Sequence, residues 1–228
     1  MNIQIIGTSH IAAQSINEIK TAVKTDKPDI IAVELDFQRA SALMAEQKNK
    51  VKLSDILKIG VKSYLFVKIG QYVQQKLGQM VGVSPGSEMK TALELARKEK
   101  LEIALIDQPI QTTLKNFSKE LTWKEKFRFI GDIFKGLFFK KKQMKELGLE
   151  DFDLSKVPPE EVIEKMMTTL KKRYPNVYKT LVADRNRYMV KKLVKLLRTN
   201  PQKKILVIVG AGHKQGMEEL LLKVDVVG

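Results

Sequence analysis

Two histidines are the residues of this chain best suited to chemistry. They are His10 and His213, and each closes a Gly-x-x-His sequence that directly follows an apolar run. A single histidine in such a place is more often a helix cap or a satisfied polar residue. Two in the same local frame, with carboxylates at the ends of neighbouring runs, match the ligands that zinc, manganese or cobalt accepts. The pair favours a metal site, and a structural role for each histidine remains the alternative.

Carboxylates end the two other apolar runs of the chain. Glu34 and Asp36 follow the run at 30–33, and Asp107 follows the run at 102–106. Glu34 could form a structural ion pair with an arginine, ligate a metal or polarise water. Asp107 could ligate the same metal or cap the next helix. Asp36 is expected to be the N-cap of a helix that starts at Phe37.

Three further charged residues are candidates for the same site. Glu88 follows Pro85-Gly86-Ser87 and suits the first turn of a helix, where its charge is favourable, but it could also face the site. Arg185 and Arg187 lie two positions apart on an expected helix, so they point in different directions. At most one is expected to reach the site, where its planar guanidinium would bind a carboxylate or an oxyanion.

Short apolar runs separated by amphipathic patterns predict the framework that holds these residues. Strands are expected at 3–6, 30–33, 102–106 and 205–209, and helices at 13–24, 38–47, 88–100, 158–170 and 178–197. The alternation predicts an α/β fold with a central, largely parallel or mixed sheet of four to five or more strands, flanked by helices. Residues 224–227 could add a final edge strand. Ligands of such sheets bind beyond the carboxyl ends of the strands, where the candidates above would meet.

Two helical patterns without strand signal interrupt this framework. They cover about 53–80 and 120–172 and are expected to form a cap over the sheet. No internal repeat or linker divides the chain, so residues 1–228 are expected to form a single domain with these two insertions.

The charge of the chain indicates which partners it could bind more than which reaction it could catalyse. The formal net charge is +15, and segment 171–204 alone carries twelve basic residues and one acidic residue. Signatures of zinc fingers, RNA-recognition and helix-turn-helix domains are missing, so no specific nucleic-acid partner is expected. The absence of cysteine excludes a thiol nucleophile and a Cys-ligated zinc. An anionic membrane surface is a candidate partner of the basic helices at 51–80 and 127–142, and apolar faces on the insertions would favour a homodimer.

Six motifs, in the order in which they occur, resemble the TraB/PrgY family. They are Gly7-Thr8-Ser9-His10, the run from Pro28 to Asp36 with Arg39 behind it, Pro85-Gly86-Ser87-Glu88, Ile106-Asp107, Asp184-Arg185-Asn186-Arg187-Tyr188-Met189 and Gly210-Ala211-Gly212-His213. The family is related to the Tiki metalloproteases and, more distantly, to GumN, ChaN-like and erythromycin-esterase proteins. Jointly the motifs are specific, whereas each alone is weak.

The resemblance implies an active centre on an α/β core. It implies His10, Glu34 and His213 as the centre of the site, with Glu88, Asp107 and Arg185 as further candidates. Tiki relatives imply divalent-metal-dependent peptide hydrolysis with manganese or cobalt, and TraB-like relatives are linked to the shutdown of peptide pheromones. Two features depart from the pattern. Gln108 stands where the family has arginine after the aspartate, and the membrane segments of PrgY-like proteins do not follow before Gly228.

The leading hypothesis is therefore a metal-dependent hydrolase that acts on a peptide substrate. A manganese, cobalt or zinc ion would be held by His10, His213, Glu34 and Asp107, with Glu34, Arg185 and Glu88 in catalysis. The alternative is a non-catalytic protein that binds a membrane or a partner through its basic amphipathic helices. The expected location is the cytoplasm or the membrane periphery, either as a free protein or as the soluble domain of a longer membrane protein.

Overall fold

The computed structural model describes residues 2–8, 13–45, 86–125, 127–128, 131–132 and 159–224. His10 and the expected insertion at 53–80 lie outside these residues, as do most of the insertion at 120–172 and of the edge strand at 224–227.

Four strands form one sheet in the order β1-β4-β2-β3. Their bounds are β1 Ile3–Thr8, β2 Ile30–Val33, β3 Glu102–Leu105 and β4 Ile205–Gly210. All three strand pairings are parallel, with Ile30 of β2 opposite both Ile205 and Glu102. Every residue of β4 is buried, as expected of an interior strand of a parallel sheet that is covered on both faces. The predicted α/β fold and its four strands are confirmed.

Helices connect and flank these strands. Their bounds are α1 Ala13–Asp26, α2 Phe37–Met44, α5 Ser87–Lys98, α6 Ile110–Glu120, α9 Glu160–Arg173, α10 Pro175–Tyr178, α11 Asp184–Thr199 and α12 Ala211–Leu222, with a π-helical turn η1 at Lys179–Ala183. The helix predicted at 178–197 is thus the end of α10, the turn η1 and most of α11. The helix α12 begins within the second Gly-x-x-His motif, so His213 lies in its first turn.

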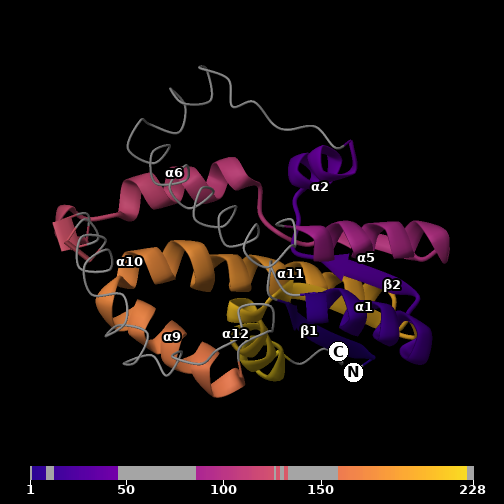
Figure 1. Cartoon of the computed structure of the whole chain (residues 1–228). Coiled ribbons are helices and arrows are strands. Elements are labelled where there is room, and N and C mark those ends of the chain that lie inside the picture. The colour runs from indigo at the N-terminus through magenta and orange to yellow at the C-terminus, as the bar shows by residue number, and fades with distance from the viewer. Residues whose placement is uncertain are drawn as a thin grey trace.

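The sheet separates two hydrophobic cores. Successive side chains of a strand point to opposite faces. On one face Ile31 and Ile208 pack with residues of α1 and α5, and on the other Ala32 and Val207 pack with residues of α11 and α12. Figure 1 shows α1 in front of the strands and α11 behind them. The fold is therefore a three-layer arrangement in which helices from opposite ends of the chain cover opposite faces.

The helices α6, α9 and α10 lie together at the end of the molecule away from α1 and α5 (Figure 1). A buried carboxylate, Glu125, ties this end together. It accepts hydrogen bonds from the Asn176 backbone N–H at 2.8 Å and side-chain amide at 2.9 Å, and from the hydroxyl of Thr122 at 3.0 Å. Burial would raise the pKa of Glu125, but the hydrogen bonds from Asn176 and Thr122 outweigh it and lower that pKa. The carboxylate thus holds the first turn of α10, the helix that leads into η1 and α11.

In the part of the chain that the structure describes, no helix combines the length and the apolar character needed to cross a bilayer.

Candidate functional site

The candidate site lies at the carboxyl ends of β2 and β4. These strands are neighbours, yet the chain leaves β2 for α2 and α5 on one face and leaves β4 for α12 on the other. Ligands of open parallel sheets bind where neighbouring connections diverge in this way. Glu34 follows β2 directly and is 5% exposed, and its Oε2 accepts the Gly210 backbone N–H at 2.6 Å. The carboxylate therefore bridges the two strand ends at the start of α12, where the helix dipole favours a negative charge.

Arg185, at the start of α11, connects the carboxylates of this site. Its guanidinium forms an ion pair with Glu34 Oε1 and two hydrogen bonds to Asp107, of 3.1 Å from Nε to Oδ1 and 2.6 Å from Nη2 to Oδ2. Burial would lower the pKa of Arg185, but the charges of Glu34 and Asp107 outweigh it and raise that pKa above its usual value. Arg187 instead pairs with Asp184 on the surface, with its side chain 66% exposed. Of the two arginines, Arg185 therefore contacts the candidate site and Arg187 does not.

His213 is bound through both of its ring nitrogens. Its Nε2 lies 3.0 Å from Arg185 Nη1 and 3.4 Å from Glu34 Oε1, while its Nδ1 lies 2.6 Å from Asn186 Oδ1. The side chain of His213 is 10% exposed. Adjacent residues of α11, Arg185 and Asn186, therefore hold opposite edges of the same imidazole ring.

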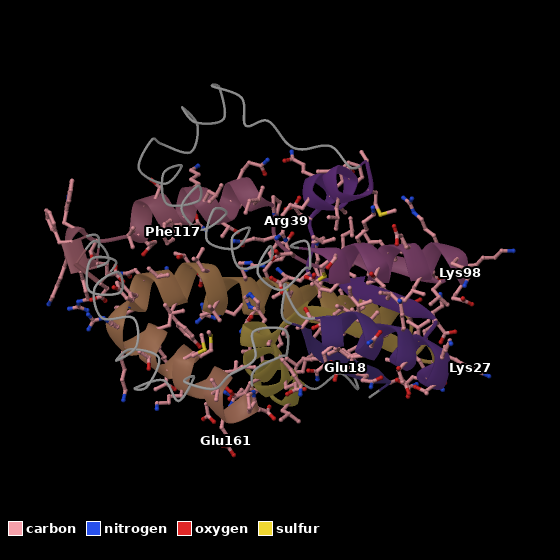
Figure 2. The ribbon with its side chains drawn as sticks, in the orientation of Figure 1. Glu18, Lys27, Arg39, Lys98, Phe117 and Glu161 are labelled. Atoms are coloured by element: carbon pink, nitrogen blue, oxygen red, sulfur yellow. The ribbon has the colours of Figure 1, made fainter. Side chains whose placement is uncertain are left out.

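A second arginine supports Asp107 from the side of α2. Arg39 forms an ion pair with Asp107, donates to the Glu34 backbone carbonyl at 3.0 Å and donates from Nε to Asp36 Oδ2 at 3.0 Å. Figure 2 shows Arg39 near the middle of the molecule, where α2 approaches the other helices. The Asp107 oxygens also accept from Arg185 and from the N–H of Gln108, at 2.8 Å for the latter. Asp107 thus binds two arginines, Arg39 from the side of α2 and Arg185 from α11.

Asp36 is the N-cap of α2, as predicted. Its Oδ1 accepts the N–H groups of Gln38 at 2.8 Å and Arg39 at 3.0 Å. Its Oδ2 also accepts the N–H of Ile110 at 3.2 Å, the first residue of α6. One side chain therefore caps two helices, and it fixes α2 and α6 next to the ends of β2 and β3.

The π-helical turn η1 directly precedes α11, whose second residue is Arg185. Such turns are rare in proteins, and those that do occur are often found at functional sites. The carbonyl of Leu181 within this turn accepts a hydrogen bond from Arg185 Nη1 at 3.2 Å. The turn therefore supplies a further contact to the guanidinium, in addition to Glu34, Asp107 and His213.

Two glycines determine how closely the surrounding elements approach. Gly86 has a φ of 82°, a left-handed conformation that glycine adopts without strain, and it starts α5, in whose first turn Glu88 is 1% exposed. An ideal Cβ on Gly7, in β1, would lie 3.2 Å from the Cα of Ala211, so this glycine permits the contact between β1 and α12.

The structure brings together Glu34, Asp107, Arg185 and His213 of the predicted residues. Glu88 is buried in the first turn of α5. His10 lies outside the described residues. Among the residues described, no group of three His, Asp or Glu side chains is arranged to hold a metal ion.

Sequence patterns assigned no role to three residues that support the site. Arg39 and Asn186 belong to motifs that carry the family resemblance, but their contacts come from elements distant in sequence. Gly216 is a lone glycine in the middle of α12, and an ideal Cβ there would lie 2.5 Å from Asn186 Nδ2. One sequence signal could have found Gly216. A glycine inside a helix costs about 1 kcal/mol relative to alanine, so its presence there often indicates a close contact.

Comparison with known proteins identifies the family of the chain. The model of the TraB/PrgY/gumN family matches residues 2–225. The chain belongs to this family. The resemblance inferred from the six motifs is thereby confirmed for nearly the whole chain.

Relatives of this TraB/PrgY/gumN protein occur in archaea and animals. An uncharacterized protein of Methanocaldococcus jannaschii is 34% identical over 98% of this chain. The human TraB domain-containing protein is 22% identical over 95% of this chain, and the mouse protein of that name is 23% identical over the same share. The chain spans 54% of the length of the archaeal relative and 62% of the human one.

Proposed function

We propose that this family member is a metal-dependent hydrolase of peptides, with His213, Glu34 and His10 at its centre. The observation that carries the proposal is the 3.4 Å distance between His213 Nε2 and Glu34 Oε1 beyond the ends of two parallel strands. Two atoms that bind one ion tetrahedrally at about 2.1 Å are about 3.4 Å apart. Imidazole and carboxylate together suit manganese, cobalt or zinc. His10 would be the third ligand, as the family resemblance implies.

The residues around this pair would have separate roles. A divalent ion bound there would polarise a peptide carbonyl and lower the pKa of water. Glu34 would use Oε1 as a ligand while Oε2 stays on the Gly210 N–H. Arg185 donates to both Nε2 and Oε1, so it would release these atoms when an ion binds. Asp107 would keep Arg185 beside the site. There the guanidinium can bind the negative charge that develops on a carbonyl oxygen. We leave Asp107 out of the ligand set because both of its oxygens accept from arginines, whereas only Oε1 of Glu34 does.

The outer edge of β1 supports a peptide as the substrate class. Of the described strands, only β4 pairs with β1, so none occupies its other edge. A cavity of about 770 Å³ lies along this edge and is lined in part by Gln4, Gly7, Ile163 and Ala211. Ala211 is two residues from His213, so the cavity reaches the helix of the site. An extended peptide can add to such an edge through main-chain hydrogen bonds.

Metal binding and peptide cleavage test the proposal together. Protein treated with a chelator and dialysed is titrated with Mn²⁺ or Co²⁺, and a mixed peptide library is followed by mass spectrometry. His213→Ala and His10→Ala are each expected to weaken metal binding more than about tenfold and to abolish cleavage. Glu219→Ala, exposed on the helix of His213, is the control and should retain both. Undiminished metal binding and cleavage in both histidine variants would refute the proposal.

A second candidate function rests on a basic ridge beside an apolar groove. Arg187, Lys191, Lys195 and Arg198 recur every three or four positions along α11, so they form one line. They border a groove of about 540 Å³ whose lining also includes Val194 of α11 and Leu220 of α12. We propose that this ridge binds an anionic bilayer, because each basic residue near such a surface contributes about 1 kcal/mol.

Sedimentation with vesicles of phosphatidylcholine, with and without phosphatidylglycerol, tests this second function. Lys191→Glu with Lys195→Glu is expected to reduce binding to the anionic vesicles at least about tenfold at low salt. The matched control is Lys20→Glu with Lys24→Glu, an exposed pair with the same spacing on α1, across the sheet. Equal losses in the two double variants would show that only the net charge matters, and would overturn the assignment to α11.

A further inference from the structure

The protonated nitrogen of His213 can be assigned from its partners. Arg185 Nη1, at 3.0 Å from Nε2, can only donate, since a guanidinium has no acceptor. In the neutral ring Nε2 must then be the acceptor, and the proton resides on Nδ1. Nδ1 lies 2.6 Å from Asn186 Oδ1, which accepts that proton's hydrogen bond. Asn186 is 3% exposed, so water does not readily replace it.

We infer that Asn186 and Gly216 form a positioning pair that, together with Arg185 at Nε2, holds His213 in its Nδ1–H tautomer. Neither residue touches the reacting atoms of the proposed hydrolase. They act through His213, by keeping the lone pair of Nε2 on the side of the ring where Arg185 and Glu34 lie. The use of that lone pair as a metal ligand rests on the proposed function, whereas the tautomer itself does not.

Gly216 makes room for the amide of Asn186. His213 and Gly216 are three residues apart on α12 and so share the face that meets α11. An ideal Cβ at position 216 would lie 2.5 Å from Asn186 Nδ2, closer than such atoms approach in proteins. Any side chain there must displace the amide, and with it the acceptor of the Nδ1–H hydrogen bond. The glycine thus provides the space that the hydrogen bond needs, at the cost of helix propensity.

Nitrogen NMR tests this pair without reference to activity. The chain has two histidines, so the His10→Ala background leaves His213 as the sole source of imidazole signals. In metal-free protein with a neutral ring, Nδ1 is expected to have the shift of a protonated nitrogen and Nε2 that of an unprotonated one. Asn186→Leu keeps the approximate shape but removes the acceptor, and should move both shifts part of the way toward the average of the two tautomers, because Arg185 still donates to Nε2. Gly216→Ala should move them in the same direction.

Gly131→Ala is the matched control, because an ideal Cβ on Gly131, also in a helix, meets no atom of the described residues within 4 Å. Its His213 shifts are expected to equal those of the parent protein. If one of the variants Asn186→Leu and Gly216→Ala does not fold, the shifts of the other one test the inference. Unchanged shifts in a folded variant of either residue would overturn the inference, as would an Nε2–H tautomer in the parent. A protein that passes this test but cleaves no peptide would refute the proposed function alone.

Discussion

Arg185→Met is expected to lower the free energy of unfolding by about 3–5 kcal/mol, the usual cost of removing one partner from a buried ion pair. Glu34 and Asp107 are 5% and 2% exposed, and both bind the guanidinium. Methionine fills much of the same volume without a charge, so Glu34 would lose Arg185 as a partner and Asp107 would keep one of its two arginines, Arg39. The loss is measured by urea unfolding followed by circular dichroism.

Arg187→Met is the matched control for this prediction. It makes the same substitution two residues along the same helix, at a side chain that is 66% exposed and paired with Asp184. Exposed pairs contribute little, so a change below about 1 kcal/mol is expected. If Arg185→Met gives too little folded protein to measure, Arg185→Lys takes its place. Lysine keeps the charge but cannot reproduce the planar contacts with Asp107, and an intermediate loss is expected. Equal stabilities of the variants at 185 and 187 would contradict the role given to Arg185.

Glu34→Gln is expected to lower the free energy of unfolding by about 2–3 kcal/mol, although the two side chains have nearly the same shape. Both carboxylate oxygens are acceptors in the structure, Oε2 from the Gly210 N–H and Oε1 from Arg185. A glutamine must direct its amide NH₂ at one of these donors, whichever way it is turned. One buried donor then loses its acceptor, and Arg185 loses one of its two negative partners.

Thermal and urea unfolding of this variant are compared with those of Glu161→Gln. Glu161 points away from the body of the molecule on α9 (Figure 2), and it is exposed. Its variant should differ from the parent by less than about 0.5 kcal/mol. A fully stable Glu34→Gln protein would mean that the two oxygens of Glu34 are not both needed as acceptors.

The sequence was sufficient for the framework because its signals are local. The strand at 205–209 is a continuous run of Ile, Leu and Val, as buried parallel strands are, and the structure has β4 there. That at most one of Arg185 and Arg187 would reach the site followed from helical geometry, since positions two apart face different sides. The cap at Asp36 followed from residue type and place, before a helix.

The site itself depended on contacts that no local pattern encodes. Asn186 approaches His213 across 27 positions of sequence, and Arg39 approaches Asp107 across 68. A turn such as η1 has no recognised sequence signal, so the helix predicted at 178–197 carried no sign of it. The ion pair between Glu34 and an arginine was an alternative from the start, yet only the fold identifies Arg185 as its partner.

The backbones of the two Gly-x-x-His motifs lie close together. Gly7 belongs to the first motif and Ala211 to the second, and a Cβ on Gly7 would press on the Cα of Ala211 at 3.2 Å. Backbone atoms cannot turn aside as a long side chain can, so an added methyl group would shift the start of α12. His213 lies two residues further along that helix. A substitution at Gly7 would thus act on the imidazole of the other motif as though it had been made within the site, with every side chain that touches His213 left intact.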